Sequence, residues 1–189
     1  MNELIYFVGP PGVGKSTLMA GLTAACARQS VAHPFAYDVL TLPRAGGRAV
    51  ELGVRRGAFS GTDALAMNVQ PRVLSWLMEG DYQLVLGEGD RLGNRKFLDS
   101  VLHLDWRVHL VALTLPLADL DMRCLARGSH QSSSWRQGRQ TKVWNLAEWA
   151  RQQQAARRFI DVYELSTAAS RPSVLSALQL MIPTLRRFE

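Results

Sequence analysis

The sequence predicts an α/β fold in which a parallel β-sheet carries helices on both faces and a basic lid closes over one edge. Three observations predict it. Short apolar segments typical of buried strands alternate with longer segments of helical periodicity. A glycine-rich loop joins the first strand to the first helix. A segment near the end, residues 123–158, carries eight Lys or Arg residues against one Glu.

The first strand, loop and helix are predicted from residues 4–28. Residues 4–8 form an apolar run bounded by glycine, which indicates a buried strand, and residues 17–28 predict a helix. Between them, residues 9–16 match G-x-x-x-x-G-K-[ST], the phosphate-binding P-loop. A glycine-rich turn with a chance lysine is the alternative, and the flanking strand and helix disfavour it.

The chemistry of this loop assigns roles to its residues. Glycines let backbone amides point at phosphate oxygens, and the helix dipole adds positive potential there. Lys15 is expected to contact the β- and γ-phosphates of ATP, Ser16 to ligate Mg²⁺, and Thr17 to be the next donor. The expected nucleotide-binding residues are Gly9, Pro10, Pro11, Gly12, Val13, Gly14, Lys15, Ser16 and Thr17.

The segment after the first helix contains a candidate acid. Residues 31–37 predict a second strand, and Pro34 either argues against this strand or places it at a sheet edge. Asp38 follows, and ligands of open parallel sheets bind outside the carboxyl ends of strands. Asp38 is therefore a candidate general base or substrate contact, with a turn aspartate as the alternative.

The next segment predicts a loop and a helix. Residues 43–61 hold five glycines and four arginines against one acid, which indicates a basic flap beside the substrate or a solvated flexible loop. Residues 62–80 predict a helix that Thr62 caps and that Pro71 kinks or splits. Asp63 faces either a substrate or the positive end of this helix.

A charged loop follows the strand predicted over residues 82–86. A P-loop enzyme needs an acid at this strand end, near Mg²⁺ and the γ-phosphate. Glu88 is the first choice, as a ligand directly or through water. Asp90 is a second acid or the general base, and Arg91 is a candidate contact for a substrate phosphate.

The remaining residues complete the sheet and supply the lid. Arg123 and Arg127 lie one helical turn apart on one face, and residues 127–142 predict a polar, basic and mobile lid. Lid arginines stabilise charge on a moving phosphoryl group, which makes both arginines catalytic candidates. The other predicted elements are a helix over residues 92–104, a strand over 108–115, a helix from 116 to 127, a strand within 159–165 and a helix over 172–181.

Composition limits the class of protein. A length of 189 residues with 47% hydrophobic content supports one domain spanning residues 1–189. No apolar run is long enough for a membrane span and the first residues do not resemble a signal peptide, so we expect a cytoplasmic protein. The net charge of +6, carried mostly by arginine, suits a polyanionic partner or reflects genome composition. The sequence contains no signal that sets an oligomeric state.

The P-loop, the Glu88-Gly89-Asp90-Arg91 strand end and the Arg123/Arg127 pair together resemble the P-loop kinases that include nucleoside and nucleotide kinases. The resemblance covers most of the chain and implies phosphoryl transfer from ATP. Thymidylate kinases carry an aromatic residue or histidine after the Asp-Arg pair, whereas Leu92 stands here. This departure disfavours a free deoxynucleoside monophosphate as the acceptor.

A narrower resemblance links residues 61–67, 86–92 and 135–142 to the phage 5-hydroxymethyluracil DNA kinases. It implies a DNA substrate in the host cytoplasm and transfer to the 5-hydroxymethyl group of 5-hydroxymethyluracil. The product, 5-phosphomethyl-deoxyuridine, is a step toward hypermodified thymidines that resist host restriction. The alternatives are a nucleoside or deoxynucleoside monophosphate kinase, and an NTP-hydrolysing switch or binding protein.

Overall fold

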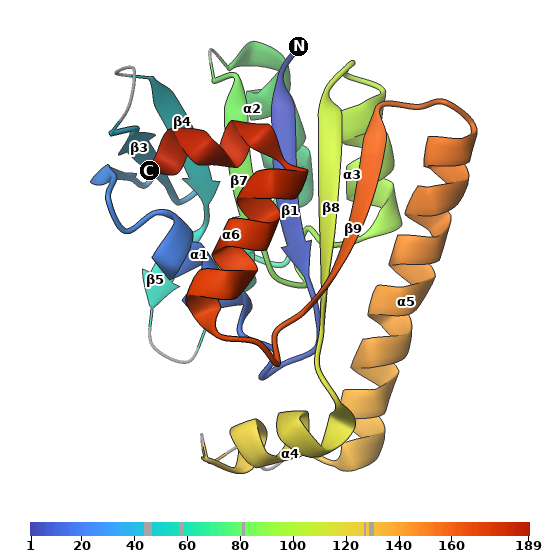
Figure 1. The fold of residues 1–189 in the computed structure, drawn as a ribbon. Helices are drawn as coiled ribbons and strands as arrows, with labels where there is room; N and C mark the ends of the chain where they lie inside the picture. The colour runs from blue at the N-terminus through green and yellow to red at the C-terminus, as the bar shows by residue number, and fades with distance from the viewer. Residues whose placement is uncertain (44–46, 57–58, 81, 127, 129–130) are drawn as a thin grey trace.

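A computed structural model describes residues 1–43, 47–56, 59–80, 82–126, 128 and 131–189 (Figure 1). Its main sheet has seven strands. They are β1 (Glu3–Val8), β2 (Ala27–Val31), β3 (Tyr37–Thr41), β4 (Arg48–Leu52), β7 (Leu84–Glu88), β8 (Arg107–Thr114) and β9 (Ile160–Ser166). Their order across the sheet is β2-β3-β4-β7-β1-β8-β9. Five neighbouring strands run parallel to one another, namely β4, β7, β1, β8 and β9. At one side of the sheet, β2 and β3 add an antiparallel wing.

Helices and a small hairpin complete the described elements. The helices are α1 (Lys15–Leu22), η1 (Thr62–Ala64), α2 (Gln70–Glu79), α3 (Arg95–Leu102), α4 (Leu117–Ala126), α5 (Ser133–Ala155), α6 (Arg171–Met181) and η2 (Pro183–Phe188). The hairpin pairs β5 (Val54–Arg56) with β6 (Phe59–Gly61). None of the helices in the described ranges combines the length and the apolar character that a bilayer crossing needs.

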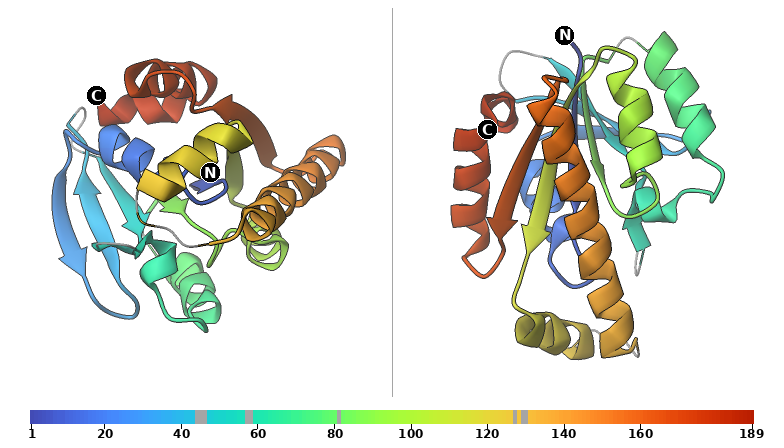
Figure 2. Two further views of the ribbon diagram at one scale, coloured as in Figure 1. Left: turned by 90° about the horizontal axis from the view of Figure 1, so that it is seen from below. Right: turned by 90° about the vertical axis from the view of Figure 1, so that its right-hand side faces the viewer.

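Helices cover both faces of the sheet, which confirms the predicted fold class (Figure 2). In β1, Leu4, Tyr6 and Val8 belong to the buried cluster shared with α2, α3 and α5. Ile5 and Phe7 belong to the second cluster, shared with α1, α6 and η2. Alternation along one central strand therefore supplies both cores, as the two-residue period of a strand requires.

The carboxyl ends of the parallel strands form the edge where ligands of such sheets bind. α4 lies across this edge, and α5 leads away from it along one side of the sheet (Figures 1 and 2). The chain therefore places the end of α4 and the start of α5 beside the loops that follow β1 and β7.

The antiparallel wing corrects two predictions. The first helix ends at Leu22 instead of running to residue 28, and β2 begins at Ala27. The strand predicted over residues 31–37 is wrong, because residues 32–36 form the connection between β2 and β3. Pro34 lies in this connection, where its missing amide hydrogen breaks no ladder.

The segment predicted as a flap or flexible loop is largely strand. β4 inserts between β3 and β7, and the β5–β6 hairpin follows it. Val50 and Leu52 are buried on one face of β4, and Glu51 is buried on the other. The buried Glu51 carboxylate accepts a hydrogen bond of 2.8 Å from Arg28 of β2, which offsets the cost of removing it from water.

Two helix predictions also change. The helix predicted over residues 62–80 is divided into two parts, the short 3₁₀ helix η1 and the α-helix α2. Pro71 lies in the first turn of α2, where proline is tolerated, so it marks the start of the second part. The segment predicted as a mobile lid is helical from residue 133 onward, where α5 begins. The Ser132 hydroxyl caps this helix by accepting a hydrogen bond from the Trp135 amide. Residues 127, 129 and 130 of the predicted lid lie outside the described residues.

Candidate active site

The P-loop connects β1 to α1 at the carboxyl edge of the sheet. Gly14 caps α1 with a φ of 100°, a left-handed conformation that favours glycine. α1 then begins at Lys15, and its first turn contains no acidic residue. The amides and the positive dipole of this turn therefore face the loop with no acidic side chain in the turn to neutralise them.

The side chains of the motif lie where the sequence predicts them, at the start of α1. The Lys15 ammonium donates hydrogen bonds to the carbonyl oxygens of Gly9 at 2.7 Å and Pro10 at 3.3 Å, which holds its charge beside the loop. Ser16 and Thr17 are exposed in the first turn. This arrangement can hold a polyphosphate between backbone amides, the ammonium group and two hydroxyls.

Two segments that are distant in the sequence contact the P-loop. Arg123 of α4 donates to the Val13 carbonyl at 3.5 Å and to the Thr167 carbonyl at 3.1 Å. The Thr167 hydroxyl, just after β9, donates to the same Val13 carbonyl at 2.8 Å. Cys124 contacts the loop as well, with its Sγ 3.7 Å from the Pro11 carbonyl. The Arg123 guanidinium thus lies directly against the phosphate-binding loop.

Glu88 ends β7 next to the P-loop. It pairs in register with Phe7, two residues before Gly9, and is only 3% exposed. The Thr62 hydroxyl donates to the Glu88 carbonyl at 2.8 Å. Gly61 packs against the Glu88 side chain so closely that an added Cβ would lie 2.6 Å from its Cγ. The β5–β6 hairpin and η1 therefore fix the position of this acid.

The loop after β7 is held by a carboxylate and a phenol. Asp63 Oδ1 accepts hydrogen bonds from the amides of Asp90 at 2.8 Å and Arg91 at 2.9 Å. The Tyr6 hydroxyl donates to the Gly89 carbonyl at 3.0 Å, and burial raises the pKa of Tyr6 well above its ordinary value. Of the two roles considered for Asp63, the observed one is local: its carboxylate positions the loop that carries Asp90.

The Asp90 side chain links this loop to α5. Its Oδ2 lies 2.5 Å from Arg139 Nη1 and 3.5 Å from Lys142 Nζ. Arg139 also lies over the Trp135 ring, with 4.7 Å between the guanidinium carbon and the ring centroid. The basic helix predicted as part of a lid therefore reaches the candidate general base.

Comparison with known proteins identifies the family. The family described as P-loop Nucleotide Kinase3 matches residues 1–178. The chain belongs to this family. Membership implies that the P-loop binds a nucleotide, as its geometry indicates. No curated protein matches the chain.

Matches to solved structures cover nearly all of this chain at low identity. The G domain of the T. maritima FeoB iron transporter is 15% identical, with a TM-score of 0.40, and the match covers 98% of this chain and 99% of that one. A Sar1-type small COPII coat GTPase from Encephalitozoon cuniculi, in complex with GDP, is also 15% identical, with a TM-score of 0.38. That match covers 99% of this chain and 76% of that one.

In this member of the nucleotide kinase family, Asp38 does not lie at the end of a parallel strand, the position that made it a candidate general base. It is the second residue of an antiparallel strand, and β4 separates β3 from β7, the strand of Glu88. Its carboxylate accepts hydrogen bonds from Arg28 at 2.5 Å and Ser30 at 2.6 Å and is 4% exposed. We therefore correct the assignment of Asp38 as a general base, because its premise was the end of a parallel strand.

The other candidate residues divide into two groups. The P-loop, Glu88, Asp90 and Arg123 converge on the carboxyl edge of the sheet. Arg127 lies outside the described residues.

Ser16 and Glu88 fit a magnesium site, because hydroxyl and carboxylate oxygens are the hard donors that Mg²⁺ prefers. One or two protein ligands suffice beside phosphate oxygens.

Several of the described residues that contact this site directly are not predicted from the sequence. Thr167, just after β9, donates a hydrogen bond to the P-loop, and Tyr6 of β1 donates one to the loop after β7. Arg139 and Lys142 were counted in the basic segment without a partner, although both contact Asp90. The spacing of Trp135, Arg139 and Lys142, four and then three residues apart, was the available signal that they share a helical face.

Proposed function

We propose that this chain is an ATP-dependent kinase that transfers the γ-phosphoryl group to a hydroxyl group on nucleic acid. Our preferred acceptor is the 5-hydroxymethyl group of 5-hydroxymethyluracil in phage DNA, giving 5-phosphomethyl-deoxyuridine. The bond between the γ-phosphorus and the β–γ bridging oxygen breaks, and a bond from phosphorus to the acceptor oxygen forms. The hydroxyl proton passes to a carboxylate, and ADP leaves.

The observation that carries the proposal is the position of Asp90. The amide contacts to Asp63 fix its loop directly after Glu88, and Glu88 is in register with the end of β1. Phosphoryl transfer to a hydroxyl group requires a site for the donor and a base for the acceptor. Here the P-loop serves the donor, and a partly exposed carboxylate at the neighbouring strand end serves the acceptor.

The residues at the donor side act by position and charge. Lys15 and the loop amides hold the β- and γ-phosphates, and Arg123 neutralises charge that develops on the moving phosphoryl group. Ser16 and Glu88 would hold Mg²⁺, which would further neutralise the phosphate charge. At the acceptor side, Asp90 orients the hydroxyl group and takes its proton.

The DNA acceptor is supported by charge and by resemblance. The net charge is +6, and residues 123–158 concentrate eight basic residues on α4, α5 and their flanks. Arg136 is buried, but the other basic residues of this stretch that the structure describes are at least partly exposed, and such a charge excess favours a polyanion with salt-dependent affinity. Trp144 is 61% exposed on α5, where an aromatic ring is available to stack on a base. The resemblance to 5-hydroxymethyluracil DNA kinases leads to the same acceptor.

Transfer of labelled γ-phosphate tests the proposal. The protein is incubated with labelled ATP, and in parallel with labelled GTP, and offered DNA containing 5-hydroxymethyluracil, ordinary DNA, deoxynucleoside monophosphates or water alone. Label in the modified DNA only is the expected result. Label in ordinary DNA would move the acceptor to another hydroxyl, and release of free phosphate alone would indicate an NTP-hydrolysing switch.

A second candidate, a nucleoside or deoxynucleoside monophosphate kinase, is favoured by the description of the matching family as nucleotide kinases. Label in a free nucleotide in the same experiment would establish it and reject the DNA acceptor.

Lys15→Ala is the variant that tests the donor site. The ammonium group donates to two carbonyls of its own loop and its removal opens no buried core, so we expect the fold to persist, as checked by circular dichroism. Loss of one preorganised cation at the transferred group should lower the transfer rate by about 100-fold or more. Unchanged transfer by a folded Lys15→Ala protein would reject the proposed donor site.

A further inference from the structure

Two cations of α5 converge on a single oxygen of Asp90. Arg139 Nη1 and Lys142 Nζ lie 2.5 Å and 3.5 Å from the same Oδ2. The three side chains remain accessible, with exposed fractions of 35% for Arg139, 42% for Lys142 and 32% for Asp90. Accessible ion pairs of this kind are weak, so an incoming anion can compete for the cations.

The surroundings of this contact carry excess positive charge. Arg91 and Arg95 lie on the same side of the molecule: Arg91 contacts Met67 and the Asp63 carbonyl, and Arg95 donates to the Asn145 carbonyl of α5 at 3.3 Å. Among the described residues of this region, the four cations Arg91, Arg95, Arg139 and Lys142 outnumber the three carboxylates Asp63, Glu88 and Asp90, and the Asp63 carboxylate is already engaged by backbone amides.

The geometry of the two cations suits a phosphate better than a carboxylate. A phosphate group offers at least two unesterified oxygens, one for the planar Arg139 fork and one for the Lys142 ammonium, whereas both cations now share one oxygen. The Trp135 ring holds the Arg139 guanidinium independently of Asp90, so the arginine stays in place when its partner is exchanged.

We propose that Arg139 and Lys142 form the binding site for a phosphate group of the acceptor, and that the Asp90 carboxylate occupies this site until the acceptor displaces it. The proposal rests on the proposed function, in which Asp90 takes the proton of the acceptor hydroxyl. Displacement by the phosphate frees the Asp90 carboxylate for that step. The Asp90 carboxylate is therefore an internal competitor that a phosphate-bearing acceptor displaces.

The test is a binding measurement without ATP, so its result does not depend on transfer. The full-length protein is titrated into a fluorescent single-stranded oligodeoxynucleotide that lacks 5-hydroxymethyluracil, and anisotropy is followed. A competition arm with a deoxynucleoside monophosphate distinguishes the phosphate of a strand from that of a free nucleotide. Asp90→Asn, Arg139→Ala and Lys142→Ala are compared with the natural sequence.

Arg151→Ala is the matched control. Arg151 is a cation of the same helix, but it pairs with Glu148 and Glu164 on a different flank. Circular dichroism and thermal unfolding establish that each variant is folded, and Arg139→Lys provides a second arginine variant that retains the charge without the planar fork.

Asp90→Asn should tighten phosphate binding several-fold, because the internal competitor loses its charge, while Arg139→Ala and Lys142→Ala should weaken it. Each of these two losses should lower the salt dependence by about one unit of slope in log affinity against log salt concentration. Tighter binding of the mononucleotide but not of the oligonucleotide would retain the site and assign it to a free nucleotide. Unchanged or weaker binding by Asp90→Asn, or an Arg139→Ala effect no larger than that of Arg151→Ala, would overturn the proposal.

Discussion

The Thr167 hydroxyl donates a 2.8 Å hydrogen bond to the carbonyl oxygen of Val13, which lies 154 positions earlier in the chain. Arg123 donates to the carbonyls of both residues. The loop after β9, the P-loop and α4 are thus joined at one point, the carbonyl of Val13. The conformation of the P-loop depends on these two segments as well as on its own glycines.

Thr167→Val tests this dependence, since valine has a similar shape and lacks the hydroxyl. A buried carbonyl that loses its best donor costs about 1 kcal/mol, so we expect nucleotide affinity to fall about fivefold. Calorimetric titration with ATP measures the change. Thr114→Val is the control, because the Thr114 hydroxyl makes a longer contact of 3.4 Å to the Leu165 carbonyl. Equal effects of the two variants would show that Thr167 has no special role at the P-loop.

Asp38 should contribute to stability and not to turnover. Its carboxylate neutralises Arg28 together with Glu51, and Arg28 is largely buried with a side chain only 22% exposed. Asp38→Ala should lower the free energy of unfolding by about 1 to 3 kcal/mol, less than for a fully isolated pair because Glu51 remains. Urea unfolding measures the loss, and the transfer rate per folded molecule should stay within about twofold, well short of the effect of removing a catalytic base.

Asp99→Ala is the control for this variant. Asp99 also pairs with an arginine, Arg158, but its side chain is 44% exposed, so its removal should cost less than about 1 kcal/mol. A folded Asp38→Ala protein with undiminished stability and a strongly reduced transfer rate would restore Asp38 as a catalytic candidate.

The parts of the fold and the site that follow from the sequence are those set by residues close together in the chain. The P-loop and the acid at the end of β7 are local features, with residue identity, spacing and position relative to a strand all within a few residues. The apolar segments of β1, β7 and β8 predict central strands for the same reason. The helices on both faces follow from this pattern, and the structure confirms them.

The features that the sequence did not predict depend on partners far away in the chain. β4 contains the buried Glu51, which a strand tolerates only because Arg28 of β2 reaches it. β2 itself is an edge strand with mostly exposed side chains and has no apolar pattern. The contact of Asp90 with Arg139 joins residues 49 positions apart, and neither segment signals its partner.

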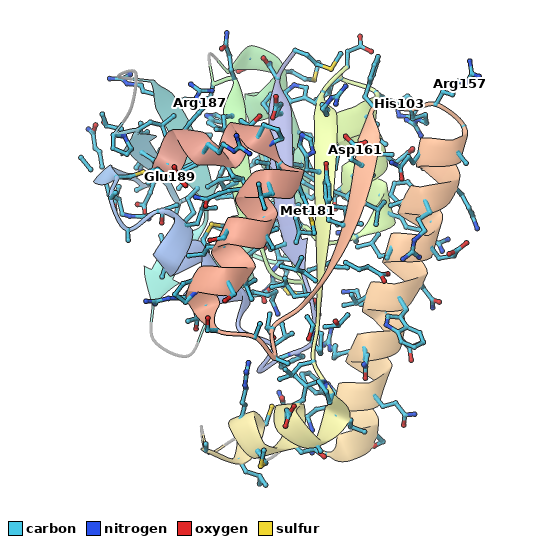
Figure 3. The ribbon with its side chains drawn as sticks, viewed as in Figure 1. His103, Arg157, Asp161, Met181, Arg187 and Glu189 are labelled. Atoms are coloured by element: carbon cyan, nitrogen blue, oxygen red, sulfur yellow. The ribbon has the colours of Figure 1, made fainter. Side chains whose placement is uncertain are left out.

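His109 should make stability depend on pH. It is buried between Glu3 and Asp161, with contacts of 3.4 Å and 3.7 Å. Asp161 lies near the start of β9, at the end of the sheet away from α4 (Figure 3). Burial lowers the pKa of His109 below its ordinary value although both carboxylates oppose the shift. The unfolded chain therefore binds more protons below about pH 6.5, and the folded state loses stability as the pH falls from there.

Urea unfolding between pH 5 and pH 8 measures this dependence, and His109→Asn should reduce the loss on the acid side. Tyr163, whose hydroxyl lies 3.3 Å from His109 Nδ1, has its pKa raised to about 12 mainly by burial and does not titrate in this range. A pH profile of stability that His109→Asn leaves unchanged would contradict the prediction.

Asp63 should control the placement of Asp90 without touching a substrate. Asp63→Ala removes the acceptor of two amide hydrogen bonds and should lower the maximal transfer rate about tenfold or more, because small displacements of a catalytic group are costly. Asp63→Asn keeps an acceptor oxygen and should retain most of the rate. Steady-state kinetics separate this effect from binding, since the Michaelis constant for ATP should change little in either variant.

Gly89→Ala tests the same loop by adding atoms instead of removing them. Gly89 has a φ of 112°, and an added Cβ would lie 2.9 Å from the Asp63 carboxylate. The methyl group should strain the backbone and push Asp63 away from the amides of Asp90 and Arg91, so its kinetic defect should resemble that of Asp63→Ala. In the double variant the two defects should not add, because both act through one contact. Additive losses would mean that Gly89 and Asp63 position Asp90 by separate routes.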